Sequence, residues 1–149
     1  MPDDEGVAYR FDTNNSITYL CLFIDVTEAF GVQQCRIMSF NLEVLGDNFT
    51  PPFDPRVGVT VVQLLADFFQ KHDDVVIYVA DCSDGRQLKR KLRFNRWLND
   101  YPVAGVTLDE YIYKDVIAGI IRKTTELHEG ISYAIRDGLN AMKTQRSGN

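Results

Sequence analysis

The hydrophobic residues of this chain recur with two different spacings, and the order of these spacings restricts the fold more than any other feature. Runs rich in β-branched and aromatic residues, which are typical of strands, occupy 8–13, 17–26, 35–45, 75–80, 106–113 and 116–123. Apolar residues about 3.6 positions apart, which are typical of helices, occupy 54–71, 84–98 and 125–142. The predicted order is βββ-α-β-α-ββ-α, an α+β fold built on a mixed, mostly antiparallel sheet.

Turn and cap residues support these boundaries. The sequence Asn14-Asn15-Ser16 predicts a hairpin between the first two strands. Asp54 followed by Pro55 predicts a helix start, because aspartate accepts hydrogen bonds from the first turn and proline has no N–H to satisfy. The wholly apolar run 75–80 predicts a central strand that is buried on both faces. We predict one domain over residues 1–149, with flexible tails at 1–6 and 144–149.

Composition excludes several classes of protein. The three cysteines, at positions 21, 35 and 82, form no C-x-x-C pair, which is typical of a reduced compartment. The acidic start shows no secretory signal, and the longest apolar runs are far below the roughly 18 residues of a membrane helix. We therefore predict a cytoplasmic protein that does not contact membranes. His72 and His128 are isolated, so we predict no metal site, and no motif predicts a catalytic residue.

The segment 82–98, CSDGRQLKRKLRFNRWL, gathers positive charge in an acidic protein. Residues 84–96 contain six basic residues and one acidic residue, a net charge of +5, so the rest of the chain carries −10 of the total of −5. On a helical wheel, five of the cations fall within an arc of about 120°; they are Arg86, Lys89, Arg90, Arg93 and Arg96. The wheel turns Leu88, Leu92 and Leu98 away from this arc and places Phe94 and Trp97 beside it.

Two interpretations of this basic helix stay open. Its cations could form a solvated face that acidic groups of the same chain neutralise. Alternatively, they could bind an anionic partner, either a nucleic acid or an acidic protein. The predicted anion-binding residues are Arg86, Lys89, Arg90, Arg93, Arg96 and Trp97, with the indole available for stacking on a base.

The same segment resembles an uncharacterised bacterial family of about this length. The shared signature is S-D-G-R…R…F-N-R-W, which is matched here by Ser83, Asp84, Gly85, Arg86, Arg90, Phe94, Asn95, Arg96 and Trp97. The resemblance extends over most of the chain. It implies no particular activity.

The predicted order of elements is also similar to the core of the Gcn5-related N-acetyltransferases. That likeness implies an alternative function, an acetyl-CoA-dependent N-acetyltransferase with a degenerate motif. The pyrophosphate of acetyl-CoA would lie at Arg56, Gly58 and Thr60, at the start of the first helix. Lys89 stands where many of these enzymes carry a tyrosine that protonates the thiolate. A third interpretation is an interaction or regulatory protein, which could form a homodimer through sheet edges or the last helix.

Overall fold

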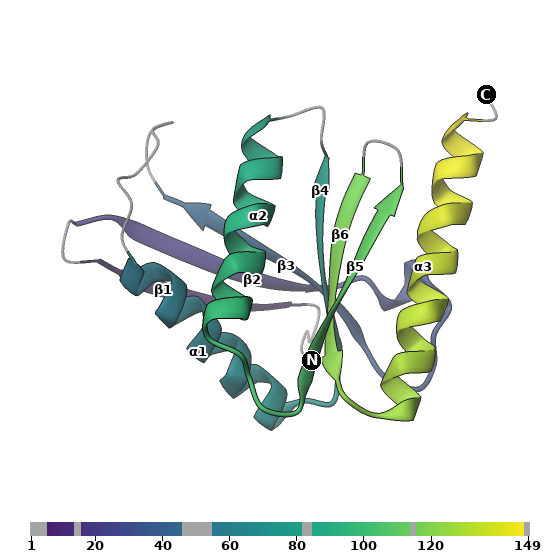
Figure 1. Ribbon diagram of the computed structural model, residues 1–149, viewed down its shortest axis with the longest axis horizontal. Helices are drawn as coiled ribbons and strands as arrows, with labels where there is room; N and C mark the ends of the chain where they lie inside the picture. The colour runs from purple at the N-terminus through teal and green to yellow at the C-terminus, as the bar shows by residue number, and fades with distance from the viewer. Residues whose placement is uncertain (1–5, 14–15, 46–54, 82–84, 114–115, 148–149) are drawn as a thin grey trace.

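The computed structural model describes residues 6–13, 16–45, 55–81, 85–113 and 116–147, which form one six-stranded sheet with three α-helices (Figure 1). The predicted α+β class and the predicted order of elements are confirmed. The elements are β1 Gly6–Asp12, β2 Thr18–Asp25, the short 3-10 helix η1 Thr27–Ala29, β3 Ile37–Val44, α1 Pro55–Lys71, β4 Val75–Asp81, α2 Gly85–Asp100, β5 Val106–Tyr113, β6 Val116–Lys123 and α3 Glu126–Ser147.

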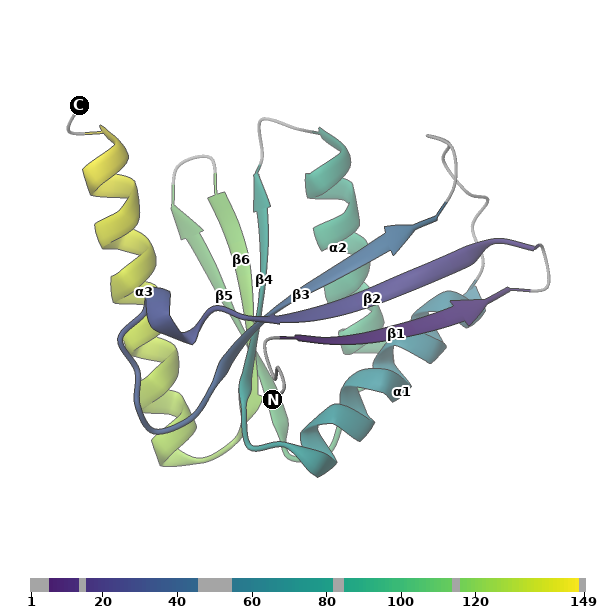
Figure 2. The same cartoon turned by 180° about the vertical axis from the view of Figure 1, so that it is seen from behind.

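The strand order across the sheet is β1-β2-β3-β4-β6-β5. Neighbouring strands are antiparallel except β3 and β4, which α1 connects as a parallel pair. This parallel pairing runs only from Ile37 opposite Val75 to Ser39 opposite Ile77. Beyond that point β3 turns away from β4, and the three N-terminal strands fan out from the rest of the sheet (Figures 1 and 2).

The divergence of β3 changes the predicted burial of β4. Residues Val75–Tyr78 are buried, as the apolar run predicted. Val79 is exposed, because β3 no longer lies beside β4 at this position. The prediction of a strand buried on both faces is therefore right for the first half of β4 and wrong at Val79.

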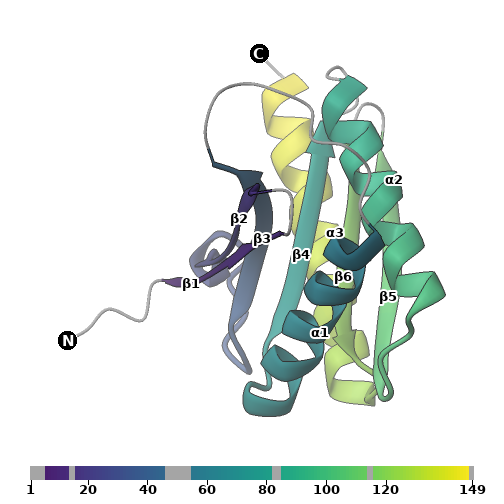
Figure 3. The same cartoon turned by 90° about the vertical axis from the view of Figure 1, so that its left-hand side faces the viewer.

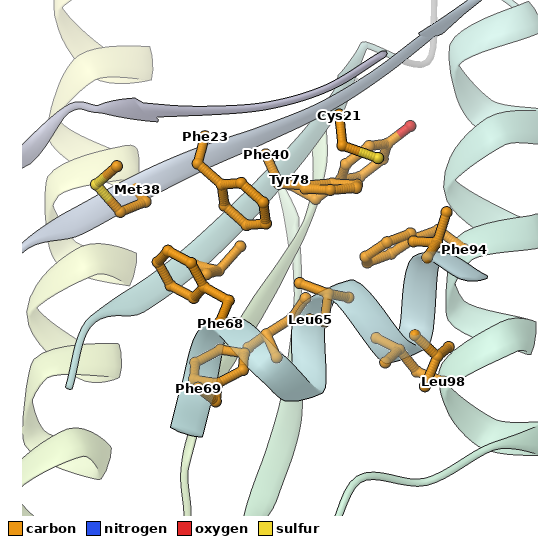
Figure 4. Packing of buried hydrophobic residues seen from close by; sticks show 14 of the residues in the cluster. Cys21, Phe23, Met38, Phe40, Leu65, Phe68, Phe69, Tyr78, Phe94 and Leu98 are labelled. Atoms are coloured by element: carbon orange, nitrogen blue, oxygen red, sulfur yellow. The ribbon is translucent and has the colours of Figure 1, made fainter. Parts of the chain in front are cut away.

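Helices cover the sheet from both sides, α1 and α2 from one and α3 from the other (Figure 3). The α1/α2 side contains an aromatic core in which the rings of Phe23 and Phe68 stack with their centroids 4.5 Å apart (Figure 4). The α3 side contains a smaller aliphatic core, in which Ile131 and Ile135 pack against residues of β3, β4 and β6. The alternation of side chains along each strand therefore separates two cores.

The last helix, α3, buries a polar residue beside an exposed apolar one. Leu127, one of the apolar residues in the helical pattern of 125–142, is exposed, and the neighbouring His128 is buried. The imidazole Nε2 of His128 donates to the carbonyl oxygen of Asp73 at 3.0 Å, which satisfies the buried ring. The helix continues to Ser147, and flexibility of residues 144–149 stays a prediction. Residues 1–5 and 148–149 lie outside the described residues.

Candidate anion-binding helix

The basic segment is helical over Gly85–Asp100, and its apolar residues fasten it to the sheet. Phe94 and Leu98 are four positions apart, so they lie on one stripe of α2, and both are buried. The ring of Phe94 lies 5.1 Å from the ring of Phe40 on β3 and 5.1 Å from that of Tyr78 on β4 (Figure 4). These contacts fix the rotation of α2 about its axis and direct the opposite face to solvent.

Trp97 packs against α1. A Cβ atom built on Gly58 would lie 2.4 Å from Cδ1 and Nε1 of the indole, so only glycine allows this approach. The ring is half-buried and also meets Phe94 edge to face, with centroids 6.5 Å apart. The observed role of Trp97 is thus helix packing, and stacking on a nucleic-acid base stays a prediction.

Two of the predicted anion-binding residues have described side chains on the outer face, Arg93 and Arg96, and both are exposed. Arg96 Nε lies 3.8 Å from Asp100 Oδ2, with side chains 81% and 57% exposed. An exposed pair of this kind contributes about 0.3–0.5 kcal/mol. Within the described residues no carboxylate forms an ion pair with Arg93. Both guanidinium groups therefore stay accessible to a partner.

The outer face also carries an apolar side chain. Leu92 was predicted to turn away from the cations but is 56% exposed. It lies four residues before Arg96, which corresponds to about 40° on the helix. The prediction was wrong because the leucines of this segment do not share one stripe, and the core takes Phe94 and Leu98 instead.

The remaining predicted cations, Arg86, Lys89 and Arg90, lie within α2, but their side chains are outside the described part of the structure. The predicted helix caps Ser83 and Asp84 are also outside it.

A buried amide holds α2 to the sheet, and the sequence patterns did not predict it. Asn95 is 8% exposed, and its Nδ2 donates to Glu110 Oε1 on β5. No described residue bonds its Oδ1. The available signal was a polar residue directly beside Phe94, on the stripe that faces the sheet.

The predicted pyrophosphate residues lie inside the first turns of α1. Thr60 Oγ1 donates to the carbonyl oxygen of Arg56 at 2.8 Å, and Gly58 lies under the indole of Trp97. The observed contacts are those of a packed helix start. Cofactor binding at Arg56, Gly58 and Thr60 stays a prediction, and Asp54 lies outside the described residues.

The sequence patterns also did not predict an ionic cluster between the β5/β6 hairpin and α3. Asp109 accepts hydrogen bonds from Arg122 Nε at 2.6 Å and from Ser132 Oγ at 2.8 Å, and Arg136 lies 3.3 Å away. Burial alone would raise the pKa of Asp109, but the hydrogen bonds from Arg122 and Ser132 and the charges of Arg122 and Arg136 lower it below its usual value. The signal was a pair of opposite charges at inward positions of two adjacent strands.

Thiol and metal chemistry have little basis in the described residues. Burial raises the pKa of the Cys21 thiol to about 12, and it raises the pKa of Cys35 as well. Both groups are therefore weak nucleophiles near neutral pH. Cys82 lies outside the described residues. Within the described ranges, no group of three or more histidine, cysteine, aspartate or glutamate residues could hold a metal ion.

A separate hollow of about 740 Å³ lies between α1 and the segments 101–106 and 123–125. Its lining is mostly apolar. Lys123 is the one charged residue among the described residues that line it, and its Nζ is bound to Asp73 Oδ1 at 3.0 Å. Among the described residues, this hollow therefore lacks an unpaired cation such as Arg93 of α2.

These observations define an α+β protein with a mixed sheet, in which aromatic packing fastens α2 to β3 and β4. A family model described as "Family of unknown function (DUF6169)" matches residues 53–130, which is more than half of the chain, and the chain belongs to this family. The matched region contains α1, β4, α2, β5 and β6. No curated protein and no solved structure gives a significant match. None of the described helices has the length and apolar character needed to cross a membrane.

Proposed function

We propose that the protein is a binding domain whose outer α2 face docks an acidic segment of a partner protein. The observation that carries the proposal is the exposure of Arg93 and Arg96 beside the exposed side chain of Leu92. Because Phe94 and Leu98 hold the helix, these three side chains are presented without a need to reorganise α2. Arg86, Lys89 and Arg90 extend the same positive helix toward its N-terminus.

Two features favour an acidic protein segment over a nucleic acid. An exposed leucine among cations fits an acidic segment that carries an apolar side chain, whereas phosphates offer nothing for it to pack against. Trp97, the aromatic residue predicted to stack on a base, packs on Gly58 and Phe94. In addition, the chain outside residues 84–96 carries a charge of −10, which repels a long polyanion more than a short acidic segment.

The test measures binding of a short fluorescein-labelled peptide of glutamates interrupted by leucines, by fluorescence anisotropy at low salt. We expect Arg93→Glu together with Arg96→Glu to weaken binding by about tenfold or more, because two attractions become repulsions. Leu92→Ser should weaken binding by about threefold to tenfold through loss of apolar contact. All three side chains are exposed, so the variants should keep the fold, which circular dichroism checks.

Two controls separate specific docking from general charge. Lys71→Glu reverses an exposed cation on α1 and should change peptide affinity less than Arg93→Glu does. The wild type should bind a peptide with serines in place of the leucines more weakly than the original peptide. The Leu92→Ser variant should bind the two peptides equally. Absence of peptide binding overturns the proposal. Tighter binding of a single-stranded oligonucleotide, lost in the same arginine variants, would replace it with nucleic-acid binding.

We propose an acetyl-CoA-dependent enzyme as the second candidate function, because the order of elements favours it. The cofactor would contact Arg56, Gly58 and Thr60. If this proposal is right, isothermal titration with coenzyme A gives a saturable heat that Arg56→Ala reduces, since a cation near the pyrophosphate is lost. A dissociation constant of about 1 mM corresponds to a binding free energy of about −4.1 kcal/mol. Absence of heat at about 1 mM coenzyme A overturns this proposal.

A further inference from the structure

One face of the N-terminal half of the sheet has no described helix over it. α1 covers the other face of β1, β2 and β3, while α3 packs over β4 and β6. Figure 2 shows β1, β2 and β3 facing the viewer, with α1 and α2 behind them. We call this surface the open face; its residues are Ala8, Arg10, Leu20, Leu22, Ile24, Ser39, Asn41 and Glu43.

The register of the three strands arranges the open face in rows. Arg10 pairs with Leu20, and Leu20 pairs with Glu43, so a cation and a carboxylate flank a leucine in one row. In the next row, Leu22 lies between Ala8 and Asn41. In these two rows the middle strand presents an apolar stripe, with a positive charge on its β1 side in Arg10 and a negative charge on its β3 side in Glu43.

Both charged residues of the first row are available. Arg10 and Glu43 are exposed, and within the described residues neither has an ion-pair partner. Leu20 lies between them in the row, and within the described residues no ion pair joins Arg10 to Glu43. Asp12, the acidic residue of β1, lies on the same face and accepts a hydrogen bond from Thr18 Oγ1 at 2.5 Å.

We propose that the open face binds a second copy of this chain, through a twofold axis that runs along β2 between the two sheets. Half a turn about this axis exchanges the β1 side with the β3 side. Each Arg10 then faces Glu43 of the second copy, and the stripe of Leu20 and Leu22 meets its own counterpart. A twofold contact requires such a self-complementary surface.

The arrangement of charge favours a second copy over an unrelated partner. A partner surface of uniform charge would repel either Arg10 or Glu43. An identical face rotated by 180° places an opposite charge against each of them. Strand spacing and rise limit the open face to about 300 Å² per copy. Standard interfaces bury about 800 Å² per partner, so the dimer should be weak and depend on concentration.

Sedimentation equilibrium of the full chain over a range of concentrations tests this contact. We expect a reversible monomer–dimer equilibrium in the wild type, and dissociation constants about tenfold or more higher in Arg10→Glu and in Glu43→Arg. The combined exchange, Arg10→Glu with Glu43→Arg, should restore the dissociation constant to within about threefold, because the pair re-forms with its signs reversed. Leu20→Glu should abolish the dimer.

Asp137→Arg on α3 is the matched control, because it reverses an exposed acidic residue away from the open face and should leave the equilibrium unchanged. A chain that stays monomeric up to about 1 mM overturns the proposal. So does a combined exchange that fails to restore the dimer while both single variants keep native circular dichroism. The proposal is independent of α2, since Arg93→Glu should not alter the equilibrium.

Discussion

Replacing Asp109 with asparagine should lower the free energy of unfolding by about 3–5 kcal/mol at neutral pH. The carboxylate of Asp109 compensates the positive charge of Arg122, a residue only 8% exposed. It also accepts a hydrogen bond from the hydroxyl of Ser132. Asparagine keeps the volume but removes the negative charge. Its amide N–H groups would also face two arginine donors, so Arg122 would stay buried without a counter-charge. Urea unfolding followed by circular dichroism measures the loss.

The pH dependence gives this prediction a second readout. The pKa of Asp109 in the folded state lies below its usual value, so its contribution to stability is complete above the unfolded value of about 3.9. That contribution is lost as the pH falls through the folded pKa. The difference in stability between wild type and Asp109→Asn should therefore be constant near neutral pH and shrink below about pH 4.

Asp67→Asn is the matched control, because it makes the same chemical change in an exposed pair. Asp67 Oδ2 lies 3.1 Å from Lys71 Nζ one helical turn away, and its removal should cost about 0.5 kcal/mol or less. Equal losses in the two variants would contradict the prediction, since burial would then not distinguish the two carboxylates.

Replacing Gly58 with alanine should destabilise the protein by about 1–3 kcal/mol, although alanine favours helices. The added methyl would lie 2.4 Å from the indole of Trp97, so the ring or α1 must move. Circular dichroism in urea is the suitable measurement, because the fluorescence of Trp97, the single tryptophan, would change with its surroundings.

Gly130→Ala provides a control of opposite sign. Gly130 lies within α3, and an added Cβ meets nothing within 4 Å, so alanine should stabilise the protein by about 0.5–1 kcal/mol. Trp97→Leu should relieve the clash, with a coupling energy of about 1 kcal/mol or more between positions 58 and 97. If Gly58→Ala matched Gly130→Ala in stability, the close contact of α1 with Trp97 would be refuted.

The sequence predicted the elements well where the pattern is local. The alternation in β3 and the cap and amphipathic pattern of α1 follow from neighbouring residues alone, and both elements are observed. Predictions that depended on distant strands were less accurate. Val79 is exposed because β3 leaves β4, and Leu92 is exposed because the core takes Phe94 and Leu98 instead. No periodicity within residues 75–80 contains the divergence of β3, whereas the exposure of Leu92 agrees with its position about 40° from Arg96 on the helix.

The candidate site shows the same difference between features set by local spacing and features set by contacts with distant segments. The clustering of cations in one helix is a property of spacing, and the observed α2 confirms the helix itself. The role of Trp97 required knowledge of Gly58, which lies in another helix. Likewise, the Asp109 cluster joins side chains of β5, β6 and α3.

The sequence alone therefore determined the kind and order of the elements and the concentration of positive charge in one of them, because hydrophobic spacing and helix geometry act over a few neighbouring residues. Only the tertiary structure decided which face of α2 meets solvent, which charges are buried in pairs, and which sheet face stays open. These depend on the order in which the strands assemble, since that order sets which side chains compete for the same buried space.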